Sequence, residues 1–415
     1  MPEMHHRRAH CQLCNSSALT PILSLEPTPP ANAFVTEAQR NIEQPCFPLD
    51  VFQCEHCHHV QLLDVLDPAV LFENYVYVSG TSPAFVKHFE EYAAIVCSRF
   101  NPSVGSLIID IGSNDGTLLN FFKSRNYRVL GIDPAQVIAA NATAAGIETL
   151  PAFFTPKLAS EIVSTRGQAA IVSANNVFAH AEDLYSIAVG IADLLKPDGV
   201  FTFEVSYLVD VFQDVLFDTI YHEHMAYHAV GPLQRFFKRA DLELFSVARV
   251  SSHGGSLRGY VQKAGGPHTF DGTVDKLINI ERQLGLDQPA TLRKFGNRID
   301  LLRDQFKTVL QDLKKAGKSV AGYGAPAKAT TLLHHFGIKP GTLDYIIDDS
   351  PLKQGLYSPG QHIPVVSSEI LLRSTPDILL ILAWNFAEVI MTNNAAFVKK
   401  GGKFLVPMPA VRLYP

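Results

Sequence analysis

The chain reads Asp110-Ile111-Gly112-Ser113-Asn114-Asp115-Gly116-Thr117-Leu118 directly after the apolar run 107–109. This succession predicts a buried strand that breaks into a glycine turn and then opens a helix. Glycines at 112 and 116 let the backbone approach a ligand closely, and the helix N-terminus would point at that ligand. The next apolar run, residues 128–132, ends on Asp133, where a doubly wound fold hydrogen-bonds ribose hydroxyls. The stretch therefore predicts a nucleotide-binding turn at the edge of a parallel sheet.

The turn departs from the GxGxxG dinucleotide fingerprint. Its pattern Asp-x-Gly-x-Asn-x-Gly, followed by a strand-end acid, resembles the first two motifs of class I S-adenosylmethionine (SAM) dependent methyltransferases. In that fold the loop after the strand 169–173 lies beside the reacting methyl group. The resemblance implies that the cofactor is bound by Asp110, Gly112, Asn114, Gly116, Asp133 and Asn175.

Composition narrows the class of protein. A chain of 415 residues is expected to form two or three domains, and 47% hydrophobic with 18% charged residues predicts large cores. A net charge of −5 gives no electrostatic footprint for nucleic acid or an anionic membrane. No run approaches the roughly 18 apolar residues of a membrane span, and the N-terminus lacks the apolar core of a signal peptide. We therefore expect a cytoplasmic, monomeric enzyme with a small-molecule substrate.

Four of the six cysteines form two CxxC pairs, Cys11 with Cys14 and Cys54 with Cys57. In a reducing compartment such spacing indicates metal ligation or coincidence rather than disulfides. Two CxxC turns can close a tetrahedral zinc site that has no open position. We therefore predict a structural Zn²⁺ that stabilises an N-terminal lobe with little core of its own.

Strands are expected near 107–111, 128–132, 169–173 and 199–204, with helical stretches between them, as in a doubly wound α/β domain. Apolar residues at three- and four-residue spacing between 292 and 313 predict a long amphipathic helix that leads to another lobe. The predicted fold is α/β in three parts. They are a zinc-binding lobe (1–66), a central class I methyltransferase Rossmann-like domain (67–268) and a smaller C-terminal Rossmann-like domain (269–415).

The C-terminal part carries a second glycine turn. Gly322-x-Gly324-x-x-Ala327 follows a predicted strand, and Asp348 ends the next one, so NAD binding is an alternative hypothesis. Lys328 after Pro326 suits a phosphate held at a helix start equally well.

The densest cluster of reactive side chains is Tyr221-His222-Glu223-His224. It supplies a base, an orienting carboxylate and a hydrogen-bond donor. A metal site on His222 and His224 would need a third ligand that is not evident, and surface polar residues are a further alternative. A glycine-rich turn at 252–258 could contact phosphate or sugar, or serve as an ordinary turn.

The order of these motifs resembles the sugar C-methyltransferases that act on nucleotide-linked 4-keto-6-deoxy sugars. The motifs that carry the resemblance span nearly the whole chain. They are the CxxC pairs, Tyr75-Val76-Tyr77-Val78-Ser79, residues 110–116, Asn175-Asn176-Val177-Phe178-Ala179-His180, Tyr221-His222-Glu223-His224, His253-Gly254-Gly255-Ser256-Leu257-Arg258 and Gly322-Tyr323-Gly324-Ala325. The resemblance implies zinc in the first part, SAM in the second and sugar-nucleotide contacts from the third.

Carried over by motif, His224 is the expected base, with Tyr221, Glu223, Tyr75 and His180 around the sugar. The expected substrate contacts come from Tyr77, Ser79, His222, His253, Arg258, Gly324 and Lys328.

The chemistry agrees with these roles. Methylation of a carbon next to a ketone needs a base for the α-proton and donors for the enolate. The resemblance implies C3 as the methylated carbon. A small-molecule O- or N-methyltransferase and an inactive zinc-containing binding module are the alternative functions.

Overall fold

The computed structural model describes residues 4–72, 80 and 83–415. The predicted catalytic residue Tyr75 and the predicted substrate residues Tyr77 and Ser79 lie outside the described residues.

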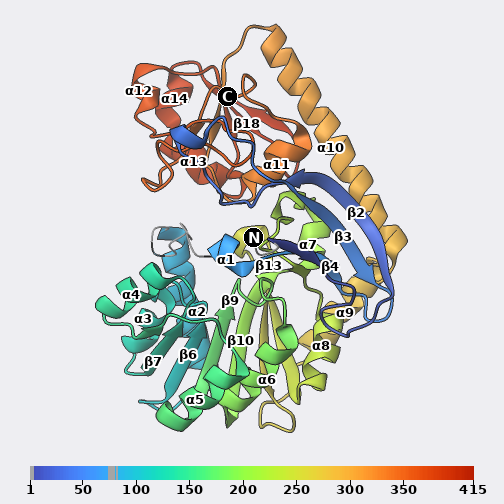
Figure 1. The fold of residues 1–415 in the computed structure, drawn as a ribbon, viewed down its shortest axis with the longest axis vertical. Helices are drawn as coiled ribbons and strands as arrows, with labels where there is room; N and C mark the ends of the chain where they lie inside the picture. Colours follow the sequence, from blue (N-terminus) through green and yellow to red (C-terminus); the bar gives the residue numbers. More distant parts are fainter. Residues whose placement is uncertain (1–3, 73–79, 81–82) are drawn as a thin grey trace.

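The central domain is built on a seven-stranded sheet in the order β12-β13-β10-β9-β6-β7-β8 (Figure 1). Its strands are β6 (Leu107–Ile111), β7 (Arg128–Ile132), β8 (Thr149–Leu150), β9 (Ala169–Asn175), β10 (Leu195–Ser206), β12 (Leu242–Val250) and β13 (Ser256–Lys263). All neighbours run parallel except β13, which is antiparallel to both β10 and β12. The four strands expected from the sequence are confirmed. β6 has β7 on one side and β9 on the other, so its carboxyl end lies at a switch point, where α/β sheets bind ligands.

Helices cover the two faces of this sheet. They are α2 (Pro83–Phe100), α3 (Thr117–Lys123), α4 (Gln136–Ala144), α5 (Pro156–Arg166), α6 (Leu184–Leu194), α7 (Leu208–Gln213) and α8 (Val230–Arg239). The buried central strand β6 consists of apolar residues apart from Asp110, as expected for a parallel strand covered on both faces.

The N-terminal lobe is an antiparallel sheet in the order β11-β4-β3-β2. Its strands are β2 (Leu19–Thr28), β3 (Phe47–Cys54) and β4 (Val60–Leu62), joined by β11 (Ala226–Tyr227) from the central part of the chain. A separate pair, β1 (His5–Arg7) and β5 (Asp64–Leu66), and the short helices η1 (Glu37–Gln39) and α1 (Pro68–Phe72) complete it. Because β11 begins two residues after His224, the sheet of this lobe extends close to the histidine cluster. The domain boundary at 66 therefore divides a sheet that both parts build, and the boundaries at 66 and 268 stay a prediction.

The C-terminal domain is a second α/β unit, drawn in orange and red in Figure 1. Its sheet has the order β16-β15-β14-β17-β18-β19, parallel except for β19. The strands are β14 (Val320–Tyr323), β15 (Ile346–Ile347), β16 (Val365–Val366), β17 (Ile378–Ile381), β18 (Lys403–Val406) and β19 (Arg412–Tyr414). The accompanying helices are α11 (Ala329–Phe336), α12 (Ile370–Arg373), α13 (Ala387–Asn393) and α14 (Ala395–Lys399).

The predicted long helix is confirmed as α10 (Pro289–Lys315), which follows α9 (Thr273–Gln283). Its buried residues fall on one stripe: Leu292, Phe295, Ile299, Leu302, Phe306 and Leu310. It runs along one side of the molecule, packs against β2 and connects the central and C-terminal domains (Figure 1). The three parts therefore pack on one another along this helix.

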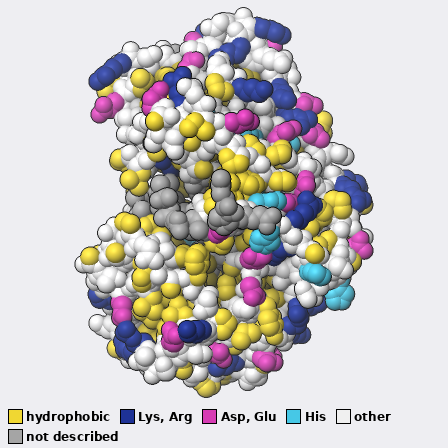
Figure 2. All heavy atoms as spheres, viewed as in Figure 1, with side chains coloured by type: hydrophobic (Ala, Val, Ile, Leu, Met, Phe, Trp, Pro, Cys, Tyr) yellow, Lys and Arg dark blue, Asp and Glu magenta, His cyan; other side chains and the backbone are white. Residues whose placement is uncertain are grey.

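In the described part of the chain, every helix is too short or too polar to cross a bilayer. On the face drawn in Figure 2, Lys and Arg side chains are scattered among acidic ones, and they form no continuous basic surface there.

Candidate active site

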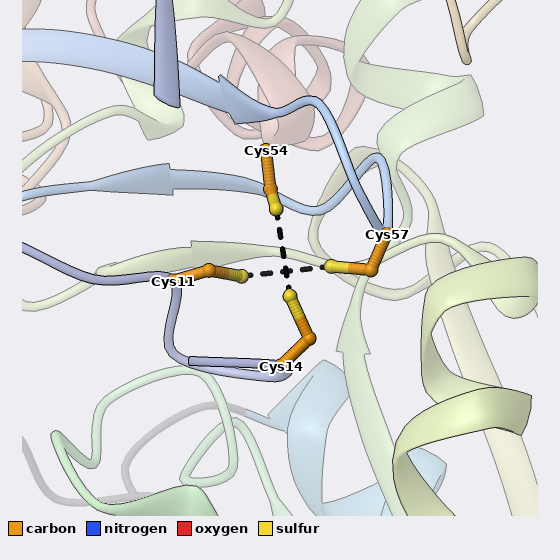
Figure 3. A group of neighbouring side chains, drawn as sticks. All are labelled: Cys11, Cys14, Cys54 and Cys57. Carbon is orange, nitrogen blue, oxygen red and sulfur yellow. Dashed lines mark hydrogen bonds between the residues drawn. The ribbon is translucent and has the colours of Figure 1, made fainter. Parts of the chain in front are cut away.

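The four predicted metal ligands meet at one point. Cys11, Cys14, Cys54 and Cys57 point their sulfurs toward a common centre (Figure 3), and these atoms all lie within 4.8 Å of one another. Sγ–Sγ distances of 3.5 Å are close to the roughly 3.8 Å edge of a tetrahedron with Zn–S bonds of about 2.3 Å. Burial raises the pKa of Cys14 to about 11, so holding all four as thiolates requires a cation. The residues fit a closed zinc site of structural type.

The two cysteine turns also accept hydrogen bonds from the central domain. Arg235 of α8 donates a hydrogen bond of 2.7 Å to the carbonyl of Cys57, and Arg239 donates to the carbonyl of Leu13 in the other turn. α8 begins three residues after the end of β11, so these bonds connect the metal site to the helix that follows the histidine cluster. Its influence therefore extends beyond its own lobe.

The backbone of the glycine turn after β6 has the geometry that close approach of a cofactor such as SAM requires. Gly112 and Gly116 have φ angles of +71° and +77°, which favour glycine. A Cβ on Gly112 would lie 2.2 Å from the side chain of Val177, and one on Gly116 would lie 2.8 Å from Ile147. Among the described residues, the Ser113 hydroxyl and the Asn175 side-chain amide are buried without a hydrogen-bond partner. Unpaired polar groups beside a glycine turn indicate a site that a polar ligand completes.

Two carboxyl groups lie at this strand edge. Asp133 accepts hydrogen bonds from the backbone N–H groups of Asn114 (2.8 Å) and Ala135 (2.9 Å), and burial raises its pKa. Asp110 accepts from the hydroxyl of Ser173 at 2.6 Å, and burial raises its pKa to about 7. Asp133 thus fixes the turn itself and occupies the position predicted for a ribose contact.

His224 is held through both ring nitrogens. Nδ1 lies 2.8 Å from the carbonyl oxygen of Thr219, and Nε2 lies 2.9 Å from the phenol oxygen of Tyr221. A carbonyl only accepts, so Nδ1 carries the proton, and Nε2 accepts from the phenol. Burial lowers the pKa of His224 to about 4, which keeps the ring neutral near pH 7. The arrangement presents a neutral imidazole whose basic atom is Nε2.

The structure brings His180 to the same place. Its ring stacks on that of His224 with 5.0 Å between centroids, and the Met225 N–H donates to the carbonyl of Ala179 at 3.0 Å. Glu223, the neighbour of His224 in the chain, is also buried. Its carboxyl group accepts a hydrogen bond of 2.8 Å from the side-chain amide of Asn32, a residue of the N-terminal lobe. Burial raises the pKa of Glu223 to about 7. Four of the five predicted catalytic residues are therefore gathered in one region, and the fifth, Tyr75, lies outside the described residues.

His222 faces away from this group. Its Nε2 lies 3.2 Å from the carbonyl of Pro48, and its ring meets that of Phe47 edge-on. Burial lowers its pKa to about 4. In the structure His222 is part of the packing between the cluster and β3, and its predicted substrate contact remains untested.

Arg258 is paired inside the central sheet. Its guanidinium binds the carboxylate of Glu204, with Nε to Oε1 at 2.6 Å, and lies over the ring of Tyr92. The other oxygen of Glu204 lies 2.7 Å from Nε2 of His88. The neighbouring His253 belongs to the short helix η4 (Ser252–Gly254) between β12 and β13. Substrate contacts of Arg258 and His253 stay predictions.

The glycine turn of the C-terminal domain faces the central domain. Nζ of Lys328 donates a hydrogen bond of 2.6 Å to Oδ1 of Asn385 and lies 3.8 Å from the ring centroid of Trp384. The indole N–H of Trp384 donates a hydrogen bond of 2.6 Å to the carboxylate of Asp218. Asp218 lies in η3 (Phe217–Thr219), just before the histidine cluster. Burial lowers the pKa of Lys328 to about 8. Gly324 begins the turn from β14 toward α11, and its N–H donates to the carbonyl of Ile347.

The sequence interpretation missed three polar residues that the fold places near these groups. Glu204 lies two residues before the end of β10 and is the register partner of Asn175 of β9. A lone acid at the carboxyl end of a buried strand was a usable signal for it. His88 and Asn32 carry no such signal, because each reaches its partner from a segment distant in sequence.

Comparisons with known families cover most of the chain. A model described as "Putative zinc binding domain" matches residues 11–72, one described as "Methyltransferase domain" matches 86–247, and one described as "C-methyltransferase C-terminal domain" matches 251–409. The chain is 34% identical over 403 residues to C-methyltransferase NovU of Streptomyces niveus, covering 97% of this chain and 96% of that protein.

Solved structures resemble part of the chain. A SAM-dependent methyltransferase from Clostridium acetobutylicum is 13% identical, with a TM-score of 0.35 over 43% of this chain and 92% of that one. Magnesium protoporphyrin IX methyltransferase from Synechocystis, with bound SAM, is 11% identical, with a TM-score of 0.32 over 43% and 79%.

Proposed function

Since the chain belongs to the sugar C-methyltransferase family of SAM-dependent enzymes with a zinc-binding domain, we propose that it methylates a carbon next to the ketone of a nucleotide-linked 4-keto-6-deoxy sugar. We further propose C3 as that carbon. The observation that carries the proposal is the pair of contacts on His224, with Nδ1 bound to a carbonyl and Nε2 facing a phenol.

A carbon acid needs a neutral base and an acid for the oxygen that becomes negative. In the proposed reaction, the phenol O–H of Tyr221 turns from Nε2 of His224 to the C4 ketone oxygen of the bound sugar, which frees the lone pair of Nε2. Nε2 then removes the C3 proton, the C–H electron pair forms the C3=C4 double bond, and the C4=O π pair moves to the oxygen. The phenol donates to the enolate oxygen that results, and His224 becomes an imidazolium.

When bound, SAM would supply an electrophilic methyl group for the enolate carbon. We propose that Asp110, Gly112, Asn114, Gly116, Asp133 and Asn175 hold the cofactor. Their place at the switch point of the sheet, with unpaired polar groups at Ser113 and Asn175, supports this assignment.

We assign Glu223 and His180 to the sugar, because both lie beside His224 and offer groups that can bind hydroxyls. Lys328 and Gly324 belong to a turn that faces η3, so we assign them, with His253, to the nucleotide part of the substrate. Tyr75, Tyr77, Ser79, His222 and Arg258 complete the proposed set.

The test is a panel of dTDP-, GDP- and UDP-linked 4-keto-6-deoxy sugars, each incubated with SAM and analysed by mass spectrometry and carbon NMR. We expect one sugar to gain one methylene in mass and to show a new C–CH₃ carbon that resists hydrolysis of ethers and esters. The His224→Asn variant serves as the inactive control. A methyl group found on oxygen would replace the proposal with the O-methyltransferase alternative.

A further inference from the structure

The histidine loop, residues 220–225, has no strand or helix of its own. It lies between η3 and the two-residue strand β11, yet it carries His224 and Glu223. A segment without ladder hydrogen bonds takes its backbone position from the groups that bind it. The groups that bind this loop therefore decide where the imidazole and the carboxyl group lie.

The N-terminal lobe binds the loop through a side chain. Nδ2 of Asn32 donates 2.8 Å to Oε1 of Glu223, while the backbone N–H of Leu62 donates 2.9 Å to the carbonyl of Met225. The hydrogen bond between Leu62 and Met225 joins two backbone groups and does not orient a side chain. The Asn32 bond, in contrast, fixes the rotation of the Glu223 carboxyl group, and so the direction of its other oxygen.

The C-terminal domain binds the opposite end of the loop. The hydroxyl of Thr331, a fully buried residue of α11, donates 2.7 Å to the carbonyl of Ile220. The preceding carbonyl, that of Thr219, is the one that accepts from His224 Nδ1. Fixing one carbonyl limits the rotation of the adjacent peptide, so Thr331 acts on the group that sets the tautomer of His224.

The same helix also holds the Asn32 segment. The hydroxyl of Thr330 donates 3.0 Å to the carbonyl of Ala31, one residue before Asn32. Two adjacent threonines of α11 thus bind the two segments that meet at Glu223. All three parts of the chain contribute a polar contact to the same loop.

We propose that Asn32 and Thr331 are positioning residues of the active site, Asn32 acting through the carboxyl group of Glu223 and Thr331 through the backbone that orients His224. The activity readout for this inference rests on the proposed function. A complete site then requires the zinc lobe and the C-terminal domain, although the central domain holds the cofactor.

The first test needs no substrate. Hydrogen–deuterium exchange of the full-length zinc-loaded protein is followed by mass spectrometry in the peptide that covers 219–228. Thr331→Val and Asn32→Ala should each raise exchange there by about tenfold, the factor expected for one lost hydrogen bond. Thr331→Ser keeps the hydroxyl and should match the wild type. Peptides covering 11–14 and the zinc content should not change, and Thr36→Ala, an exposed residue of the Asn32 segment, is the matched control.

The second test uses the sugar nucleotide identified by the panel. Thr331→Val and Asn32→Ala should lower kcat by about 10²-fold, as small misplacement of reacting groups does, with unchanged affinity for S-adenosylhomocysteine. Asn32→Ala and Glu223→Gln should be non-additive in a double-mutant cycle, because both act through one carboxyl group.

Wild-type exchange in the 219–228 peptide of Thr331→Val or Asn32→Ala would overturn the inference, as would additivity in the cycle. If the wild type methylates no sugar in the panel, the proposed function fails, and the exchange measurement still decides the positioning role.

Discussion

The phenol oxygen of Tyr221 lies 2.9 Å from Nε2 of His224, with 4.1 Å between the ring centroids. Since Thr219 fixes the proton on Nδ1, the phenol donates to the one basic lone pair of the imidazole. A neutral histidine and a hydrogen-bond donor are thus already paired in the free protein. That pairing gives two separable predictions, one for each partner.

His224→Asn should abolish methylation and also the exchange of the sugar's α-proton with deuterated water in the presence of S-adenosylhomocysteine. Enolisation precedes methyl transfer, so loss of the base removes both. Proton NMR follows the exchange, and calorimetry should show unchanged cofactor affinity. A folded His224→Asn protein with near-normal methylation would exclude His224 as the base.

Tyr221→Phe should lower both rates by on the order of 100-fold, the effect of removing one oxyanion donor. The ring is retained, so its packing on His224 persists and KM for SAM should not change. Steady-state kinetics measure kcat and the KM for SAM, and thermal unfolding checks that the ring packing persists. An unchanged kcat would mean that the phenol only holds the imidazole in the free protein.

Relative to the wild type, the Glu223→Gln variant should become more stable as the pH rises from 4.5 to 7. Burial raises the pKa of Glu223 from 4.5 to about 7, so below pH 4.5 the carboxyl is protonated in both the folded and the unfolded chain. Between pH 4.5 and 7 the unfolded chain releases the proton more readily, and the wild type loses stability, by about 3 kcal/mol in total. Glutamine does not titrate, so the free energy of unfolding of the variant should gain on the wild type across this window.

Urea unfolding of both proteins at several pH values between 4.5 and 8 measures that difference. A stability difference that stays constant with pH would show that Glu223 titrates with an ordinary pKa.

Removal of the metal should affect more than the N-terminal lobe. Purified protein should contain one zinc per chain, and Cys54→Ser should unfold or aggregate the lobe. Because Arg235 and Arg239 donate to the carbonyls of Cys57 and Leu13, chelation should also raise hydrogen exchange in α8. Cys46→Ser, which changes an exposed thiol outside the cluster, is the control. Folded, active protein without metal would rule the site out.

Much of the fold follows from local sequence pattern. Buried strands such as Leu107–Ile111 and the stripe of α10 show periodicities that depend only on neighbouring residues. The cysteine spacing predicted the metal cluster for the same reason, because each CxxC turn is formed locally. The cluster at 221–224 was also visible, since its reactive groups are consecutive in the chain.

The contacts between lobes could not be predicted in this way. β11 joins the sheet of the N-terminal lobe, and Asn32 reaches Glu223 across a long sequence separation. Pairing of β13 with β10 places Arg258, a predicted substrate contact, against Glu204, and local sequence pattern does not reveal this partner. Such outcomes depend on which segments the tertiary fold brings together, and single-sequence periodicity carries no information on that.

The cofactor site gives the last prediction, which separates a ligand contact from support of the turn. Asp133 accepts from the backbone of Asn114 and Ala135, so Asp133→Asn, which keeps the size and one acceptor, should weaken SAM binding less than Asp133→Ala does. Gly116→Val should abolish binding, because φ of +77° strains any side chain and the Cβ would meet Ile147 at 2.8 Å. The NAD alternative places its ligand at Gly324 and predicts no effect of either change. Calorimetric titration with SAM, S-adenosylhomocysteine and NAD decides between them, with thermal unfolding to confirm that each variant is folded. Tight NAD binding without heat from SAM would move the cofactor to the C-terminal domain.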